Sequence, residues 1–431
     1  MLTEEENGLL THVGRGTPMG ELFRRFWLPA LESADLGEPD GTPARLRILG
    51  ENLLAFRDST GKVGVVDAYC AHRRAQLYWG RNEDCGLRCV YHGWKYDTAG
   101  NCLDMPSEPA ASDFKTKVRL KSYPVEEHGG LVWVYMGPEE PRPAFPRLPW
   151  AEVPDGQRLM RHWFHESSWL QAVEGELDTA HVSYLHRWFD TGQAPSSALR
   201  TDITARDAAP VLTVSETDNG FTYGSRRLAG EGKYYWRLTQ WIAPSLAMFP
   251  ARKEPQAGRF WVPVDDEHTL SFTFFYHPSR ALTLEDTAGP RSGREIFSEV
   301  ERAEVRLPDG YRIDTWRAKR NIDNRYGIDR AMQKTTNFTG IYGIPDQDRA
   351  VTESMGGIVD RSQEHLGTSD TAIIAARRRL LKMVRDLQAG IEPYGPRHAE
   401  SFAVRPLDGV SAQAELQDLL DEYAGQLTVR L

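Results

Sequence analysis

The sequence contains few cysteines, no long apolar run and no basic leader. Four cysteines in 431 residues are too few for a disulfide framework. No apolar run approaches the roughly 20 residues that a membrane helix needs. The N-terminus, MLTEEENGLL, is acidic and lacks the basic region of a signal peptide. We therefore expect a cytoplasmic protein without a membrane partner.

The chain also lacks the charge pattern of a nucleic-acid-binding protein. It has 52 basic and 61 acidic residues, for a formal net charge of -9, and its basic residues are scattered, whereas a nucleic-acid surface needs clustered positive charge. A GxGxxG dinucleotide fingerprint is missing as well. With 40% hydrophobic residues, the composition indicates a globular protein that is long enough for two domains.

The first third of the chain is rich in strand patterns. Residues 44–138 alternate apolar and polar positions in short runs and contain no long helical period, which predicts a small all-β domain. We expect residues 1–43 to pack on the domains as an N-terminal segment. The Pro-rich residues 139–150 are expected to form an extended connector.

Residues 151–431 mix helical and strand patterns. The stretch 164–186 looks helical, whereas 232–242 and 259–277 indicate strands, the latter as a hairpin that turns at residues 265–268. Residues 370–387 place their apolar side chains on one helical face. The sequence thus predicts an α+β protein: an all-β N-terminal domain, then a domain with an antiparallel sheet and flanking helices.

Three of the cysteines lie in one short stretch, CAHRRAQLYWGRNEDCGLRCVYHGW, and two of them alternate with histidines as Cys70-x-His72 and Cys89-x-x-His92. These four side chains could hold a zinc ion, or a two-iron cluster with both cysteines on one iron and both histidines on the other. Zinc fingers usually place cysteines first and histidines second. The mixed loops therefore favour a Rieske-type [2Fe-2S] cluster. We expect the remaining Cys85 and Cys102 to be ordinary buried thiols.

A cluster that only passes electrons needs an acceptor, and EGELDTAHVSYLH (174–186) offers one. Asp178 and His181 are three residues apart and would share a helical face. His186 would lie about 140° further round, so the helix must end or distort between the histidines if both bind one ion. Two imidazoles and a carboxylate with open positions describe a mononuclear Fe(II) site for oxygen chemistry. The alternative is a polar helix end with two surface histidines.

The two motifs together resemble the oxygenase component of Rieske non-haem iron aromatic-ring oxygenases, over nearly the whole chain. The segments 14–30, 89–109, 167–186 and 347–370 resemble the phthalate-dioxygenase-like branch. The resemblance implies a [2Fe-2S] Rieske cluster, a mononuclear Fe(II) and a homo-oligomer, either a trimer or a hexamer. It also implies electrons from an NADH-dependent reductase, with O2 and an aromatic small molecule as substrates.

The resemblance also assigns roles to residues. Asp178 would bridge a cluster histidine of one subunit, His72 or His92, to His181 of its neighbour. The iron ligands would be His181, His186 and a carboxylate further along the chain.

The region 344–360 offers candidates for that carboxylate. A helix from about Gln347 would bury Asp348 among apolar neighbours, and a buried carboxylate without a metal partner is costly. The resemblance also points to the Asp of QDRAV, and we predict Asp348. Asp346 suits an N-cap or a turn, and Asp360 is expected to pair with Arg361. Glu353 is the remaining alternative.

The predicted function is a terminal oxygenase that hydroxylates an aromatic compound, with dioxygenation favoured over monooxygenation and arene carboxylates among the candidate substrates. A monooxygenase that hydroxylates or O-demethylates an aryl ether or a heteroaromatic compound would share the ligands. A Rieske electron-transfer protein without catalysis is the alternative of a different class, and it would have no use for the motif at 178–186. An arginine could bind a substrate carboxylate; the candidates, none of them assigned, are Arg206, Arg226, Arg227 and Arg237.

Overall fold

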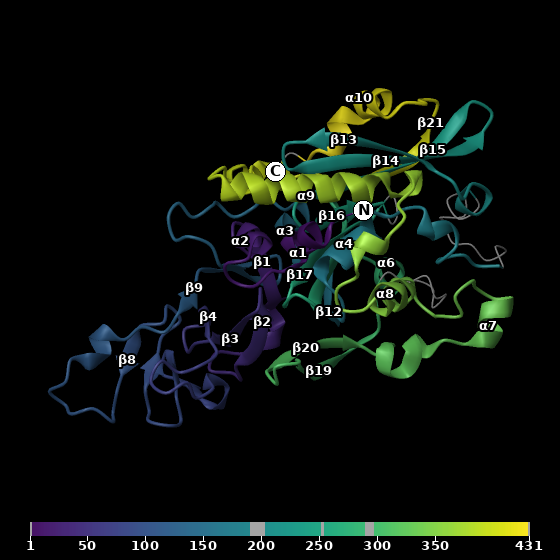
Figure 1. Cartoon of the computed structure of the whole chain (residues 1–431). Coiled ribbons are helices and arrows are strands. Elements are labelled where there is room, and N and C mark those ends of the chain that lie inside the picture. The colour runs from purple at the N-terminus through teal and green to yellow at the C-terminus, as the bar shows by residue number, and fades with distance from the viewer. Residues whose placement is uncertain (1, 190–202, 251–253, 289–296, 430–431) are drawn as a thin grey trace.

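The structure is a computed structural model that describes residues 2–189, 203–250, 254–288 and 297–429 (Figure 1). One end of the molecule consists of two four-stranded antiparallel sheets. The first has the order β2 (Ala44–Ile48), β3 (Glu51–Arg57), β4 (Val63–Asp67) and β9 (Ser122–Tyr123). The second has the order β5 (Arg81–Glu83), β6 (Gly86–Arg88), β7 (Lys95–Tyr96) and β8 (Cys102–Asp104). Together they confirm the expected small all-β unit.

A third sheet joins this β unit to the rest of the chain. Its order is β1 (Trp27–Glu32), β11 (Leu131–Tyr135) and β10 (Val125–His128), so the N-terminal segment pairs with the strand that leaves the β unit. Before β1 the chain forms α1 (Glu4–Thr11) and α2 (Pro18–Phe23). A capping box between Thr3 and Glu6 starts α1. The N-terminal segment therefore packs on both parts of the molecule.

The larger unit is built on one antiparallel sheet. Its strands follow the order β12 (Arg158–His165), β18 (Thr269–Tyr276), β17 (Gln256–Pro263), β16 (Leu246–Phe249), β15 (Lys233–Ile242), β14 (Gly220–Gly230) and β13 (Val211–Thr217), and β21 (Leu407–Ser411) also pairs with β15. Strands β17 and β18 form the predicted hairpin, with Pro263 opposite Thr269. Every residue of these two eight-residue strands is buried, and the polar Arg259, Ser271 and Thr273 are buried beside the aromatic side chains.

The larger unit also contains helices, several of which pack on the sheet, and this confirms the α+β prediction. They are α3 (Pro149–Glu152), α4 (Trp169–Leu177), α6 (Leu284–Ala288), α7 (Arg330–Thr335), α8 (Ile344–Ser354), α9 (Thr371–Gln388) and α10 (Leu416–Leu427). The predicted amphipathic helix at 370–387 is α9, and Gly390 follows its end with a φ of 83°. None of the helices in the described ranges is both long and apolar enough to span a bilayer.

The prediction of one helix over residues 164–186 is wrong at both ends. His165 still belongs to β12, where it pairs with Thr269 of β18, and α4 ends at Leu177. Asp178 has an extended backbone, with φ at -79° and ψ at 122°. A 3-10 turn at His181–Ser183 follows. Strand pairing therefore overrides the helical pattern at the start of this stretch. The helix has to end if both histidines are to bind one ion, and it ends before His181 rather than between His181 and His186.

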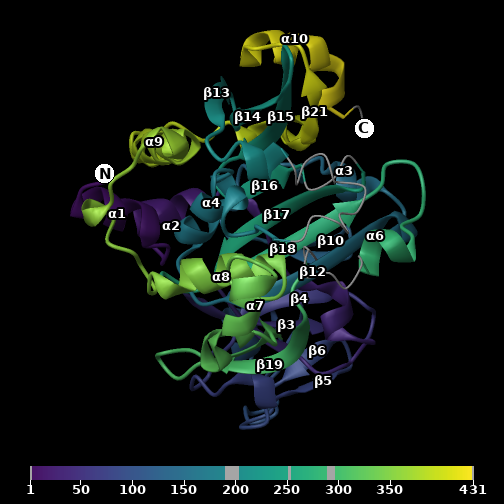
Figure 2. The ribbon, with the colours of Figure 1, turned by 90° about the vertical axis from the view of Figure 1, so that its right-hand side faces the viewer.

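A two-stranded hairpin, β19 (Val300–Arg306) and β20 (Arg312–Ala318), lies between the β unit and α8. Figures 1 and 2 show it beside the small sheets and below α7 and α8. Strand β20 packs against both β2 and β12. The hairpin therefore contacts the two parts of the molecule at once.

Candidate metal centres

Two similar turns carry the first motif. In the first turn, the backbone N–H of Cys70 donates to the Ala75 carbonyl, and the Cys70 carbonyl accepts the N–H of Arg74. In the second, the N–H of Cys89 donates to the Trp94 carbonyl, and the Cys89 carbonyl accepts the N–H of Gly93; all four bonds are 2.8 to 3.0 Å long. The turns face each other, because the ring centroids of His72 and His92 lie 4.5 Å apart. Both thiols are buried, while the two imidazoles are half-buried. The structure thus brings the four predicted cluster residues to one tip of the β unit.

Their geometry suits a two-iron cluster better than one zinc ion. Four ligands of a single zinc ion would bring their donor atoms within about 4.8 Å of one another. Among the described residues, the donor atoms of Cys70, His72, Cys89 and His92 do not converge in this way, whereas those of a group elsewhere in the chain do. The Nδ1 atoms of His72 and His92 are buried and have no hydrogen-bond partner among the described residues. Buried polar atoms are nearly always satisfied, so metal ligation is the natural role for both. The residues fit a [2Fe-2S] cluster.

The surroundings of these ligands are partly aromatic. The Trp94 indole stacks on the His72 ring at 4.3 Å and 10°, and the Tyr96 hydroxyl lies 3.3 Å from the Cys70 sulfur. Hydrogen bonding with Cys89, and then with Tyr96, lowers the pKa of the Cys70 thiol to about 5. Thiolate is the form that binds iron. Cys102 is buried as expected, but the prediction for Cys85 is wrong, because it lies exposed at the tip of the β5–β6 hairpin.

The second motif and α8 meet at a three-residue cluster. His181 Nε2 lies 3.1 Å from His186 Nε2 and 3.6 Å from Asp348 Oδ1, and His186 Nε2 lies 3.1 Å from the same carboxylate oxygen. Three donors held about 2.1 Å from one ion at right angles would be about 3 Å apart. The structure therefore brings these residues together at the spacing of one face of a metal coordination sphere.

Neighbouring residues fix the two imidazoles so that both Nε2 atoms face this point. His186 Nδ1 donates to Gln347 Oε1 at 2.7 Å, and Gln347 Nε2 in turn donates to the Ile341 carbonyl at 2.9 Å. Because the amide is oriented by that second bond, its oxygen must face His186. The Nδ1 proton leaves the lone pair of His186 on Nε2, which is the state that a metal binds.

Asp178 holds the other histidine. Its Oδ2 lies 3.4 Å from His181 Nδ1, and its Oδ1 accepts the backbone N–H of Ala180 at 2.7 Å. Burial alone would raise the pKa of Asp178, but the hydrogen bond and the charge of His181 lower it below its ordinary value. Burial likewise works against the charged form of His181, while Asp178 and Asp348 raise its pKa. The C-terminal end of α4 thus positions the ionised carboxylate of Asp178 beside Nδ1 of His181.

Asp348 lies where the sequence predicts a metal ligand, but not for the reason given. Its side chain is 32% exposed and Val351 on the same helix is 40% exposed, so apolar neighbours do not bury it. The helix also begins at Ile344, three residues before the predicted start. Partial removal from water would raise the pKa of Asp348, yet the charge of His186 lowers it. The two facing histidines, rather than an apolar shell, distinguish this carboxylate.

The competing carboxylates have other partners. Asp346 is not an N-cap, because that position is Gly343; it is buried and pairs with Arg349 at 2.6 Å. Glu353 accepts the Tyr326 hydroxyl at 2.5 Å. The predicted pairing of Asp360 with Arg361 is wrong, because that arginine pairs with Glu174 at 2.8 Å and Asp360 caps a 3-10 turn. None of the three faces the histidine pair.

Sequence reasoning missed Gln347 as a partner of His186. The only signal was its place beside Asp348 in QDRAV, and nothing in the sequence indicated that its amide would reach a histidine 161 positions away.

One arginine near the cluster lacks an anionic partner. Arg237 on β15 is 8% exposed and donates to Thr179 Oγ1, between Asp178 and His181, at 3.1 Å. No carboxylate lies within ion-pair distance of it among the described residues, and its buried Nε has no hydrogen-bond partner there. By contrast, Arg226 pairs with Glu415 at 3.8 Å, and Arg227 donates to the Thr179 carbonyl.

Comparisons with known proteins agree with this geometry. Residues 26–124 match the Rieske [2Fe-2S] domain family, and residues 134–405 match the family described as LigXa C-terminal domain like. The chain is 40% identical to the 3-chlorobenzoate-3,4-dioxygenase oxygenase subunit of Comamonas testosteroni, over 93% of each chain. It is 38% identical to the phthalate 4,5-dioxygenase oxygenase subunit of Pseudomonas putida, over 92% of this chain and 89% of that protein.

A solved structure shares the fold. The crystal structure of dicamba monooxygenase bound to dicamba superposes with a TM-score of 0.54 at 17% identity, over 85% of this chain and 98% of that one. The two matched families and the near full-length relatives identify the cofactors as a [2Fe-2S] Rieske cluster and a mononuclear iron. The chain belongs to the Rieske non-haem iron aromatic-ring oxygenases, as an oxygenase component of their phthalate-dioxygenase-like branch.

Proposed function

We propose that this oxygenase component dihydroxylates an arene carboxylate, with Cys70, His72, Cys89 and His92 holding the cluster and His181, His186 and Asp348 holding the iron. The cluster would supply electrons, and the iron would supply the site at which O2 is activated. The observation that carries the iron assignment is the convergence of two Nε2 atoms and Asp348 Oδ1 within 4.8 Å. Dioxygenation is favoured because the two relatives compared above are both named as dioxygenase subunits.

The remaining polar residues of the site orient the two imidazoles, and Asp348 supplies negative charge. Gln347 and Asp178 hold the two imidazoles in the tautomer that leaves Nε2 free. Asp348 supplies a carboxylate that stays ionised beside His186. Two imidazoles and one carboxylate would hold the ion and would leave coordination positions open for O2.

We infer that Arg237 binds the carboxylate of the substrate. A buried guanidinium without an anionic partner is costly. Arg237 donates to Thr179, which is two residues before His181, one of the proposed iron ligands. A carboxylate that accepts from its Nε and Nη atoms would satisfy it in the bidentate manner that arginine favours. Two relatives named for benzoate and phthalate substrates support this substrate class.

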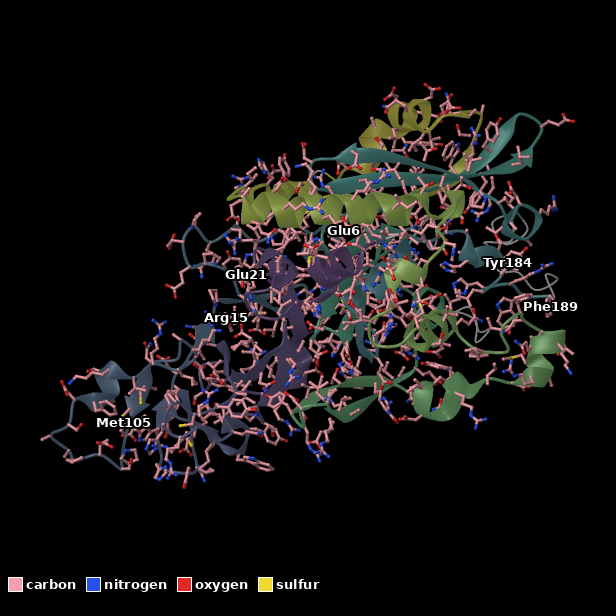
Figure 3. The ribbon with its side chains drawn as sticks, in the orientation of Figure 1. Glu6, Arg15, Glu21, Met105, Tyr184 and Phe189 are labelled. Carbon is pink, nitrogen blue, oxygen red and sulfur yellow. The ribbon has the colours of Figure 1, made fainter. Side chains whose placement is uncertain are left out.

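The electron route is proposed to cross between subunits of a homo-oligomer, a trimer or a hexamer. Figure 3 shows Met105, beside the cluster turns, and Tyr184, between the iron histidines, at opposite sides of one chain. Both sites carry exposed apolar side chains that a neighbour could cover: Val90 and Tyr91 at the cluster, and Tyr184 and Phe338 at the iron. Asp178 would then bridge His181 to a cluster histidine of the neighbour. Electrons would come from an NADH-dependent reductase in the cytoplasm.

The proposed organisation of the chain follows from these assignments. Residues 44–138 form the cluster domain and 151–431 the iron domain, with 139–150 as the connector and 1–43 packed on both.

Product analysis under 18O2 tests the reaction. The purified protein, a matched reductase and NADH are incubated with a panel of benzoates, phthalates and aryl ethers. We expect a cis-diol of an arene carboxylate with both oxygen atoms from O2. Incorporation of a single atom, or loss of a methyl group from an aryl ether, would identify a monooxygenase instead. Absence of any oxygenated product, with a cluster that is reduced and reoxidised, would identify an electron carrier.

A further inference from the structure

The β19–β20 hairpin is bonded to the cluster domain along one side. Arg45 of β2 donates to Asp314 through its backbone N–H and through two guanidinium nitrogens, at 2.7 to 3.0 Å, and to Glu304 at 2.6 Å. Its side chain is 5% exposed, so this is a buried, bidentate contact. Nearby, the Tyr311 hydroxyl donates to the Leu53 carbonyl at 3.0 Å.

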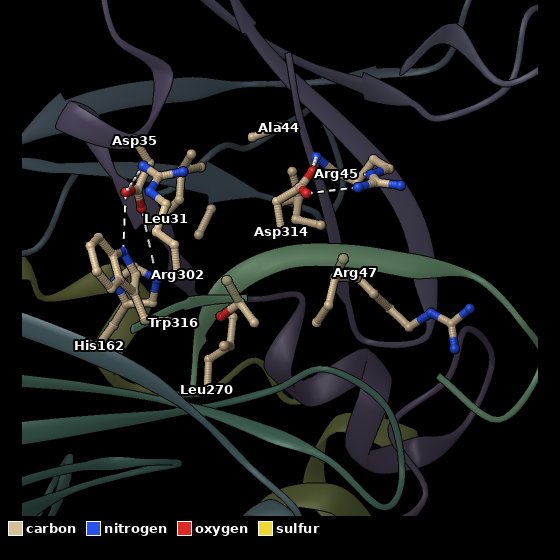
Figure 4. Close-up of a pocket in the computed structure, with 14 residues that line it drawn as sticks. Leu31, Asp35, Ala44, Arg45, Arg47, His162, Leu270, Arg302, Asp314 and Trp316 are labelled. Carbon is tan, nitrogen blue, oxygen red and sulfur yellow. Dashed lines mark hydrogen bonds and ion pairs between the residues drawn. The ribbon is translucent and has the colours of Figure 1, made fainter. Parts of the chain in front are cut away.

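A second set of contacts continues this junction around a small cavity. Figure 4 shows Asp35, which precedes β2, accepting from Arg302 of β19 and from the Trp316 indole of β20, beside His162 of β12. The two distances are 2.5 and 3.2 Å. On the opposite wall of the same cavity stands the Arg45–Asp314 pair. The hairpin is thus fixed to the N-terminal part of the molecule at several points along its length.

The open end of the hairpin is bonded to the helix that carries Asp348. Arg320, just after β20, pairs with Asp346 at 3.2 Å, and its carbonyl accepts from Arg349. Ser298, just before β19, donates to Asp346 at 2.9 Å and accepts from Arg349 at 3.1 Å. Asp346 and Arg349 are each 1% exposed. They lie two residues before and one residue after Asp348, so they hold the turn of α8 that presents the iron carboxylate.

Between these ends the hairpin is a continuous ladder. Seven residue pairs, from Val300 opposite Ala318 to Arg306 opposite Arg312, are in unbroken register. A paired antiparallel ribbon resists stretching and shear because each strand holds the other in register. A displacement at Arg45 therefore has a short, hydrogen-bonded route to α8 within one chain.

We propose that the β19–β20 hairpin positions Asp348 for the iron, with the Arg45–Asp314 contact and the Asp346–Arg349 pair as its two anchors. The inference rests on the assignment of Asp348 as an iron ligand. Asp314 and Asp346 are positioning residues, since neither faces the histidine pair. The geometry of the iron site is then coupled to the cluster domain of the same chain, separately from any contact between subunits.

The test compares Asp314→Asn with Glu127→Gln. Glu127 forms a similar two-point ion pair with Arg57, at 2.7 and 3.0 Å, without touching the hairpin, so it serves as the matched control. The readouts are the Fe(II) affinity of the mononuclear site, by competition with a chelator, and the EPR spectrum of its nitric oxide complex. Neither readout requires turnover.

Asp314→Asn should keep the Rieske spectrum, lower the Fe(II) affinity by about two- to thirtyfold and change the rhombicity of the nitric oxide signal. Glu127→Gln should match the wild type, and Asp314→Glu should recover part of the affinity. If Asp314→Asn does not fold, Glu304→Gln removes the more exposed partner of Arg45 and should produce the same change more weakly.

A double variant, Asp314→Asn with Asp346→Asn, should lose less affinity than the two single losses combined, because both act through one element. The proposal would be overturned if the variant that folds, Asp314→Asn or Glu304→Gln, had the Fe(II) affinity and the nitric oxide EPR spectrum of the wild type. Equal changes in Glu127→Gln would also overturn it. Failure of the iron assignment is distinguishable, because Asp348→Ala would then keep its iron with an intact hairpin.

Discussion

His186 Nδ1 lies 2.7 Å from Gln347 Oε1, and Gln347 is the residue just before Asp348. One turn of α8 therefore supplies both the carboxylate of the proposed iron site and the acceptor that orients one of its imidazoles. Replacing Gln347 with Leu removes the acceptor but keeps a side chain of similar size. We expect the Fe(II) affinity to fall by about 10- to 100-fold, as for other acceptors behind metal-bound histidines.

Metal analysis after dialysis against a weak chelator measures this loss for Gln347→Leu. Gln256→Leu is a useful comparison, since that buried amide of β17 accepts the Tyr276 hydroxyl at 2.6 Å and lies outside α8. Equal iron loss in both variants would assign the effect to packing rather than to the hydrogen bond.

Arg237→Met should weaken the binding of carboxylate substrates. The change removes a guanidinium that donates to Thr179 and to the Pro250 carbonyl but has no carboxylate partner among the described residues, and it keeps most of the side-chain volume. A charged hydrogen bond contributes about 1.5–3 kcal/mol, so KM should rise about tenfold to a hundredfold, while a neutral arene of the same shape should be affected little. Arg226→Met is the control, because that arginine already pairs with Glu415. An unchanged KM for benzoates and phthalates would remove Arg237 from the substrate site.

Glu353 should make stability depend on pH. Burial raises its pKa from 4.5 to about 7, so between these values the folded protein holds a proton that the unfolded chain has released. The stability that this group contributes is then greatest below pH 4.5 and declines as the pH rises towards 7, by up to about 3 kcal/mol. Urea unfolding of wild type and Glu353→Gln across this range gives the difference. A wild-type decline no steeper than that of the variant would contradict the shift.

Hybrid oligomers can show which cluster feeds which iron. We expect a chain with His72→Ala, which lacks the cluster, and a chain with His186→Ala, which lacks the mononuclear iron, to be inactive alone. If Asp178 connects sites of neighbouring subunits, co-expression of the two should restore part of the turnover, since an intact cluster then lies beside an intact iron. Inactive hybrids of confirmed mixed composition would place the electron route within one chain.

The local motifs were predictable because their ligands are close in sequence. Cys70, His72, Cys89 and His92 need only two turns to meet, and His181 and His186 need only a break in one helix. The fold class followed from strand and helix periodicity. The predicted helix at 164–186 is wrong at its start because the pairing of His165 in β12 depends on a strand about a hundred residues away.

The rest of the site depends on long-range packing. Both an expected helix and the family resemblance predict Asp348 as a ligand, but the expected apolar burial is wrong because this side of α8 is partly open. The contacts of Gln347 and Arg237 join residues far apart in sequence, so no local pattern indicates them. Cys85 is exposed because it lies at the tip of the β5–β6 hairpin, and the composition of the chain does not indicate where that tip is.

A single turnover of Asp348→Ala, with the protein reduced under anaerobic conditions before O2 is added, tests the assignment of the iron ligands. The dithionite-reduced protein is mixed with O2 and an accepted substrate, and cluster oxidation, iron content and product are measured together. We predict a normal Rieske EPR signal, loss of only the mononuclear iron, and neither rapid cluster oxidation nor product, whereas the control Asp360→Ala should behave as wild type. Retention of the mononuclear iron together with wild-type product formation in Asp348→Ala would contradict the account.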